Sequence, residues 1–307
     1  MYKKLAAFMA IGCVLLLTGC LEFESQTLTY RYDAKTDTLR IFQVYQGIFG
    51  EDRPDELSDK ELGQLQSVLS GQRTFFFANW IWEYDRDAVR KGLEDLGKPE
   101  APQDAKLEPA ARAQREAFFN LLLDNVQVEN GAFYLDGQGK LCGTQLVTVS
   151  RFSKLIVAGN AQIRQLLKSE AGREKISAQE RALFLKSARR QRAYIALEGN
   201  QLRFRLPIAR AEFDKSYGPD SSSAKQLESF KRQGGSVAFA DNEMKWSLGA
   251  PGAQAVNLTL PGTEKAYVPN AVDAVKKRAA VLVSLDAAAA AQAFVSGSKV
   301  EGRQQNP

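Results

Sequence analysis

The chain has 307 residues, of which 44% are hydrophobic and 25% are charged, and its formal net charge is +5. This composition is typical of a folded protein and excludes a disordered chain or a protein with many membrane spans. The chain contains no histidine. Ser-His-Asp triads, Cys-His dyads and His-ligated zinc sites are therefore excluded. Three cysteines are too few for a disulfide scaffold or a cysteine-rich metal site, so we expect no cofactor and no metal.

Residues 1–20 have the layout of an export signal. Two lysines at positions 3 and 4 precede an apolar stretch over residues 5–17. This stretch is shorter than the about 20 residues that a membrane-spanning helix needs, but its length is typical of a signal sequence. It ends in Leu-Thr-Gly-Cys at residues 17–20, which resembles the lipobox of bacterial lipoproteins. An ordinary cleaved signal or a short anchor helix is the alternative interpretation.

The resemblance covers residues 1–20 alone, and it implies that a diacylglycerol is attached to the Cys20 thiol and that residues 1–19 are removed. Two or three acyl chains hold a protein stably on a membrane, whereas one chain does so only marginally. We therefore expect attachment to the membrane through acyl chains on Cys20, with residues 20–26 as a short tether. Leu21 in place of an aspartate favours the outer membrane of a Gram-negative cell; otherwise we expect the outer face of the cell membrane.

Removal of the signal also changes the charge and the thiols. The signal contains two lysines and no acid, so the mature chain is less basic than the whole, and its charge gives no reason to expect a nucleic-acid partner. Cys13 is lost with the signal and Cys20 is acylated, which leaves Cys142. It lies in a strand-like run, where we expect a buried, inert thiol. A reactive thiol or an intermolecular disulfide is the alternative.

The rest of the chain alternates between hairpin and helix patterns. Apolar and polar residues alternate over 27–32 and 38–49, on either side of a polar turn at 33–37. The same scheme recurs over 131–149, 192–208 and 236–248, each with Gly, Asn or Asp in its turn. Strands with one apolar and one polar face are typical of antiparallel sheets.

Helices are predicted between these hairpins. Capping boxes begin at Ser58 and at Ser177, and helical spacing or helix start signals are found over 110–124, 153–169, 223–230, 271–279 and 286–295. We therefore predict an α+β fold, with an antiparallel sheet built from several β-hairpins and interspersed helices. We expect a single domain over 27–296 and a disordered tail over 297–307. The loops 97–109 and 214–223 are the alternative domain boundaries.

An aromatic segment runs from Phe75 to Tyr84. At a spacing of two residues, one face carries Phe75, Phe77 and Ile81, and the other carries Phe76, Trp80, Trp82 and Tyr84. A central strand that is covered on both faces explains this pattern. The functional alternative is a binding surface for a sugar ring or a lipid, formed by Trp80, Trp82 and Tyr84.

A basic segment runs from Arg164 to Arg192 and ends in the cluster Arg189, Arg190 and Arg192. Such a surface could bind anionic lipid headgroups or an acidic partner, but a solvated helix face is the simpler interpretation. A second alternative is that the acidic segment 51–61 opposes it within the fold.

Two sets of residues are candidates for hydrolysis. Ser222 and Lys225 have the Ser-x-x-Lys spacing of penicillin-binding enzymes, although a run of serines before a helix is also a capping pattern. Glu83, Asp85 and Asp87 offer carboxylates for acid–base catalysis, as glycoside hydrolysis requires. No phosphate loop, metal-ligand spacing or dinucleotide-binding fingerprint is found.

The sequence thus predicts a non-enzymatic envelope lipoprotein with a protein partner. A glycan- or lipid-binding carrier and an envelope hydrolase are the alternatives.

Overall fold

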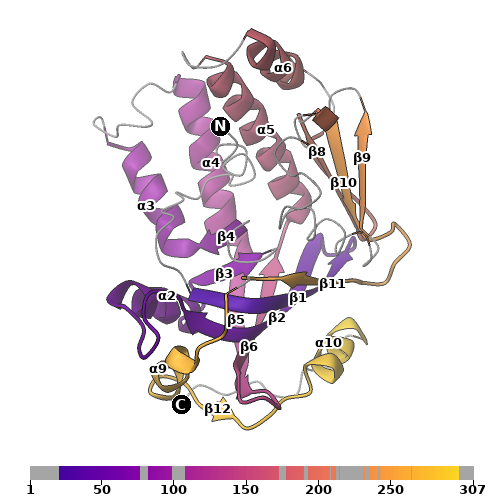
Figure 1. The fold of residues 1–307 in the computed structure, drawn as a ribbon. Helices are drawn as coiled ribbons and strands as arrows, with labels where there is room; N and C mark the ends of the chain where they lie inside the picture. Colours follow the sequence, from indigo (N-terminus) through magenta and orange to yellow (C-terminus); the bar gives the residue numbers. More distant parts are fainter. Residues whose placement is uncertain are drawn as a thin grey trace. The chain divides into compact units, whose positions relative to one another are not determined.

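The computed structural model describes residues 21–76, 82–98, 108–172, 178–189, 193–207, 209–211, 214, 231, 235–240, 243–263 and 265–296. The fold is α+β with antiparallel sheets, as the sequence predicted (Figure 1). The described chain divides into two compact units. We call residues 21–87, 126–150 and 254–296 the sheet unit, and residues 88–125 and 151–253 the helical unit. The boundaries between the units differ from the loops 97–109 and 214–223, and the single domain stays a prediction.

The sheet unit is built on a six-stranded sheet in the order β11-β1-β2-β6-β5-β12. Neighbouring strands within this sheet are antiparallel, except that β12 is parallel to β5. The strands are β1 (Leu21–Asp33), β2 (Thr38–Gly50), β5 (Val126–Leu135), β6 (Leu141–Val149), β11 (Val256–Pro261) and β12 (Val281–Leu282). The predicted hairpins at 27–49 and 131–149 form the centre of this sheet.

The first strand begins earlier than the sequence suggested. Residues 21–26, which we expected in a tether, already belong to β1, and Leu21 lies opposite Gly50 of β2. The reason is burial: Leu21 and Phe23 are 3% and 2% exposed, in the same core cluster as Leu65 of helix α2 (Asp59–Leu69). The apolar residues next to Cys20 therefore lie in the protein core.

One face of this sheet carries α2 (Asp59–Leu69) and the two-stranded sheet of β3 (Arg73–Phe76) and β4 (Trp82–Asp85). The predicted capping box of α2 is confirmed, with hydrogen bonds in both directions between Ser58 and Glu61. The C-terminal segment adds η1 (Pro269–Ala271), α9 (Val272–Lys276) and α10 (Ala287–Ser296). Phe294 of α10 stacks on Phe42 of β2, with ring centroids 5.7 Å apart.

The helical unit contains α4 (Pro109–Asn125), α5 (Phe152–Ala171), α6 (Ala178–Arg189) and most of α3 (Arg86–Leu96). Its antiparallel sheet has the order β7-β8-β10-β9, formed by β7 (Ile195–Glu198), β8 (Gln201–Leu206), β9 (Ser236–Ala240) and β10 (Glu243–Leu248). The buried amide of Asn160 joins α5 to β7, because its Oδ1 accepts from the N–H groups of Tyr194 and Ile195. The predicted helix over 223–230 and the capping box at Ser177 lie outside the described residues.

Within the described residues, we find no helix with the length and hydrophobicity that a membrane crossing requires.

Candidate functional site

The most concentrated polar feature of the sheet unit is a row of amide side chains on one face of its sheet. Gln43 lies opposite Gln145, and Gln145 lies opposite Asn130, while Gln26 is opposite Tyr45 on the same face. Gln26 and Gln43 are fully buried, and Gln145 is 1% exposed. Buried amides are costly unless their hydrogen bonds are satisfied, so the partners of this row decide its role.

These partners belong to the segment that covers the sheet. All four amide nitrogens donate to residues of α2 or β3: Gln26 to the Phe75 carbonyl at 2.6 Å, Gln43 to the Thr74 hydroxyl at 2.7 Å, Gln145 to the Arg73 carbonyl at 3.1 Å, and Asn130 to the carbonyls of Val68 and Leu69 at 3.0 and 2.6 Å. The row thus holds β3 and the C-terminal end of α2 against the sheet. Its role is structural.

The hydroxyl of Tyr45 lies at the centre of this network. It accepts a hydrogen bond from the Phe75 backbone N–H at 3.1 Å and donates to Gln145 Oε1 at 3.0 Å. Burial raises the pKa of Tyr45 to about 12, so the phenol stays protonated at neutral pH. It serves as a hydrogen-bonding group there.

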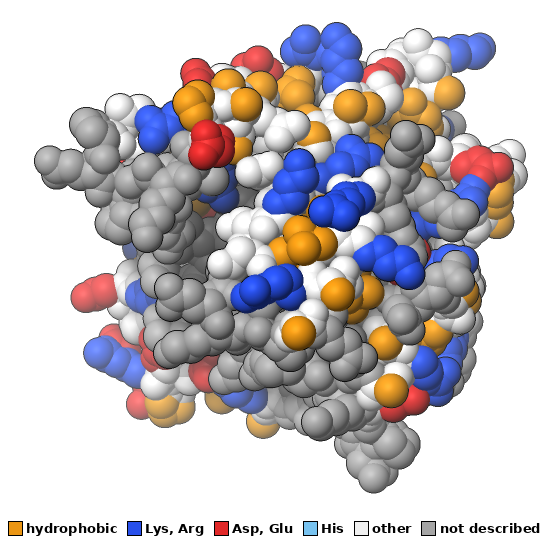
Figure 2. All heavy atoms as spheres, turned by 90° about the horizontal axis from the view of Figure 1, so that it is seen from above, with side chains coloured by type: hydrophobic (Ala, Val, Ile, Leu, Met, Phe, Trp, Pro, Cys, Tyr) orange, Lys and Arg blue, Asp and Glu red, His pale blue; other side chains and the backbone are white. Residues whose placement is uncertain are grey.

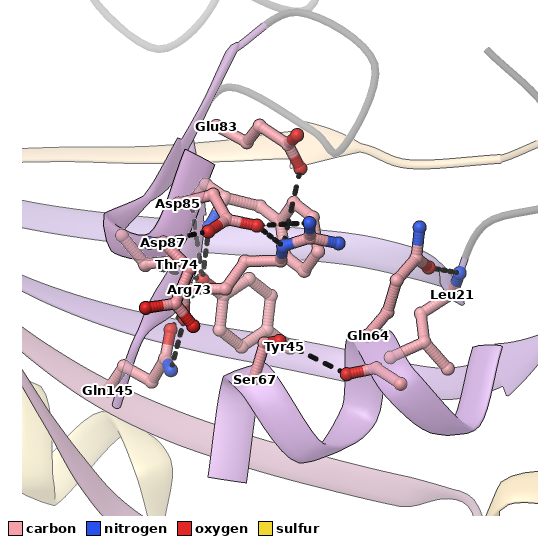
Figure 3. A network of polar contacts seen from close by, with 12 residues as sticks. Leu21, Tyr45, Gln64, Ser67, Arg73, Thr74, Glu83, Asp85, Asp87 and Gln145 are labelled. Atoms are coloured by element: carbon pink, nitrogen blue, oxygen red, sulfur yellow. Dashed lines mark hydrogen bonds and ion pairs between the residues drawn. The ribbon is translucent and has the colours of Figure 1, made fainter. Parts of the chain in front are cut away.

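The predicted carboxylates Glu83 and Asp85 lie on β4, and Asp85 is opposite Arg73 of β3 (Figure 3). The Arg73 guanidinium forms an ion pair with Asp85 Oδ2, and its Nε lies 3.9 Å from Glu83 Oε2. The Asp85 side chain is 8% exposed, whereas that of Glu83 is 24% exposed. Burial raises the pKa of the Glu83 carboxyl; Arg73 opposes this shift and Asp85 adds to it.

Asp85 has a second structural role at the start of α3. Its Oδ1 accepts a hydrogen bond from the Asp87 backbone N–H at 3.0 Å, the contact of an N-cap residue. The side chain of Asp87 is exposed. The structure therefore brings Glu83 and Asp85 together around an arginine, and Asp85 is engaged on both oxygens. Among the described residues, no group of three Asp, Glu, Cys or His side chains is placed to hold a metal ion.

The aromatic segment is not the single strand that the sequence predicted. It turns back on itself, so that Phe75 lies opposite Glu83 and Thr74 lies opposite Tyr84. Phe75 and Tyr84 are each 6% exposed and belong to the core. Trp80 lies outside the described residues, and so does the side chain of Trp82. The proposed aromatic binding surface stays a prediction.

The basic segment is described in part. Lys168, Arg181, Lys186 and Arg189 are exposed on α5 and α6, whereas Arg190 and Arg192 lie outside the described residues. Figure 2 shows Lys and Arg side chains gathered around a small group of hydrophobic side chains on one face of the molecule. The acidic segment 51–61 has partners within its own unit: Glu51 pairs with Lys265 and Arg53 pairs with Glu56.

The predicted state of Cys142 is confirmed in that its side chain is buried, at 1% exposure. Burial also raises the pKa of its thiol, which lowers the fraction of nucleophilic thiolate. Ser222 and Lys225 lie outside the described residues.

Comparison of the chain with protein-family models, with curated proteins and with solved structures gives no match.

Proposed function

We propose that this protein is a membrane-anchored lipoprotein of the bacterial cell envelope, with a non-enzymatic role in binding or assembling other envelope proteins. The observation that carries the proposal is the Leu-Thr-Gly-Cys motif at residues 17–20 behind a short, positively flanked apolar stretch. Acyl chains on Cys20 would hold the chain on the membrane.

The interactions of three of the described carboxylates support a non-enzymatic role. Asp85 is bound by Arg73 and caps α3. Glu61, which is fully buried, accepts hydrogen bonds from the backbone N–H groups of Glu51, Asp52 and Ser58. Glu24 pairs with Lys140 at 2.7 Å. A general acid or base has to be free to exchange a proton with a substrate, and these three side chains are held by the protein itself.

The first test is lipid attachment. The full chain is expressed in a Gram-negative host with radiolabelled palmitate, beside the variant Cys20→Ala. We expect label and membrane localisation in the parent chain and loss of both in the variant. A parent chain that carries no label, or a Cys20→Ala variant that stays in the membrane fraction, would contradict the proposal.

The second test is the partner. The tagged, acylated protein is crosslinked in its own envelope and purified, with Cys20→Ala as the control. We expect an envelope protein to co-purify with the acylated chain at a stoichiometric ratio. This partner should be missing from the preparation of the Cys20→Ala variant. A preparation without a partner would contradict the assembly role and favour a glycan- or lipid-binding carrier. Binding of glycans and lipids would then be measured for the parent chain and for the variants Trp80→Ala and Trp82→Ala.

A further inference from the structure

The residue that follows Cys20 is fixed in the fold. Leu21 is 3% exposed, lies opposite Gly50 in the sheet, and donates its backbone N–H to Gln64 Oε1 at 2.8 Å. Consecutive Cα atoms are about 3.8 Å apart. Acyl chains on Cys20 would therefore join the sheet unit directly, with no flexible segment between the lipid and the sheet.

Strand register shows which other segments share this end of the sheet. Leu21 pairs with Gly50 at the end of β2, and β6 runs antiparallel to β2, so β6 begins at the same end. Leu141 of β6 pairs with Leu135, the last residue of β5. Because β12 is parallel to β5, the chain from Val281 through Val283 also runs toward this end. We call this end of the sheet the anchor end.

This end presents apolar side chains to solvent. Val283 is 88% exposed and Leu282 is 36% exposed. Among the described residues, the third large hydrophobic side chain with such exposure is Val157, which lies on α5 of the helical unit. Two adjacent exposed apolar residues at the same end of the sheet as the proposed lipid attachment point, although β2, β6 and β5 lie between β12 and β1, match the composition of a membrane-contacting segment.

Three consecutive cations precede these apolar residues. Lys276, Lys277 and Arg278 are exposed at the end of α9, and within the described part of the chain none of them forms an ion pair. Two hydrogen bonds between Asn270 and the backbone of Gly50, at 2.8 and 2.9 Å, attach the start of this segment to the anchor end.

Three acidic groups nearby have partners within the protein. Glu51 pairs with Lys265, Glu56 pairs with Arg53, and Asp52 accepts a hydrogen bond from the Ser58 hydroxyl. Asp55, Asp59, Asp273 and Asp286 are exposed. The three cations of residues 276–278 are consecutive and form no ion pair with these acids among the described residues, and cations in such a position are attracted to anionic headgroups.

We propose that the anchor end docks directly on the membrane: Leu282 and Val283 enter the headgroup region, and Lys276, Lys277 and Arg278 contact lipid phosphates. This inference rests on the proposed acylation of Cys20. It adds that the sheet unit stands in one fixed orientation, with the turn at residues 33–37 at the far end of the β1–β2 hairpin, about 40 Å from the anchor along the strands.

The test uses the full acylated protein in vesicles of phosphatidylethanolamine and phosphatidylglycerol. An environment-sensitive fluorophore is attached at Val283→Cys and, as the control, at Ala34→Cys in the exposed turn at the far end of the same unit. We expect the emission of the probe at residue 283 to shift to the blue when the protein binds vesicles, and that of the probe at residue 34 to stay as in water. Replacing all three cations with glutamine in the Val283→Cys background should reduce the shift.

The possible failures are distinguishable. If mass spectrometry shows acylated Cys20 and the protein is bound to vesicles, but the probe at residue 283 stays in water, the docking is overturned and the proposed anchoring stands. If equal shifts at residues 283 and 34 are found, the fixed orientation of the sheet unit is overturned. If Cys20 carries no acyl chain, both the docking and the proposed function fail.

Discussion

The backbone N–H of Leu21 donates a hydrogen bond to the side-chain oxygen of Gln64, at 2.8 Å, and so joins the start of β1 to α2 (Figure 3). The first strand of a sheet has a free end that frays unless another element holds it. Here a helix that begins 38 residues later supplies the partner. The end of the sheet next to the proposed lipid is thereby stabilised from within the sheet unit.

Replacing Gln64 with leucine removes this acceptor. We expect the free energy of unfolding to fall by about 1 kcal/mol, the typical net value of one hydrogen bond, and the amides of residues 21–23 to exchange faster. Hydrogen exchange measured by mass spectrometry checks this. Gln66→Leu on the same helix, at an exposed position, is the control. Unchanged exchange at residues 21–23 would show that strand pairing alone holds this end.

The variants Asp85→Asn and Asp85→Ala separate the two roles of Asp85. Asparagine keeps the capping oxygen but loses the charge that pairs with Arg73, so we expect a cost of about 3 kcal/mol. Alanine loses the cap as well and should cost about 1 kcal/mol more. Urea unfolding followed by circular dichroism measures both. Equal stability of the two variants would mean that the cap contributes nothing.

The raised pKa of Glu83 predicts a dependence of stability on pH. The folded protein binds this proton more tightly than the unfolded chain, so the contribution of Glu83 to stability is complete below its ordinary pKa of 4.5. It is lost as the pH rises through the folded-state pKa. The free energy of unfolding of the parent chain should therefore fall relative to Glu83→Gln over this range.

Urea unfolding at a series of pH values from about 4 to 7 tests this. Glu116→Gln, at an exposed position on α4, is the control. Its free energy of unfolding should change with pH in the same way as that of the parent chain. If the difference in the free energy of unfolding between the parent chain and Glu83→Gln does not change with pH, the raised pKa of Glu83 is contradicted.

The thiol of Cys142 should be inaccessible in the folded protein. Burial and the raised pKa of the thiol predict that a thiol reagent at pH 8 does not react with the folded, acylated chain and reacts with Cys142 after urea is added. Reaction followed by peptide mass spectrometry assigns the site. Rapid labelling of Cys142 without urea would show that the strand around it opens.

Local patterns predicted the elements that depend on neighbouring residues. The alternation in residues 27–49 and 131–149 predicted two hairpins of the main sheet, and the spacing of Ser58 and Glu61 predicted a capped helix. The structure of the aromatic segment was harder to predict, because its residue types are compatible with a single strand and with the hairpin that β3 and β4 form. Its reversal is stabilised by Arg73, on β3, through its ion pair with Asp85 on β4.

The sequence pattern did not predict the buried network of amide side chains. Gln43 and Gln145 lie at polar positions of alternating strands, which predict a face in contact with water. The chain instead covers that face with α2 and β3: Gln43 donates to the Thr74 hydroxyl, Gln145 donates to the Arg73 carbonyl, and Asn130 donates to the Val68 carbonyl. The available signal was weak: a glutamine at such a position is compatible with solvent and with a buried partner alike.

The sequence by itself determined the exclusion of imidazole chemistry and the α+β class, and it predicted an export signal with a lipid-attachment motif, because each depends on composition or on residues close together in the chain. The tertiary structure decided that Leu21 begins a strand instead of a tether, that the amide row is buried, and that Asp85 is bound by an arginine. These properties arise from segments that are distant in sequence and meet only when the chain packs, where burial and hydrogen bonding with new neighbours override the local pattern.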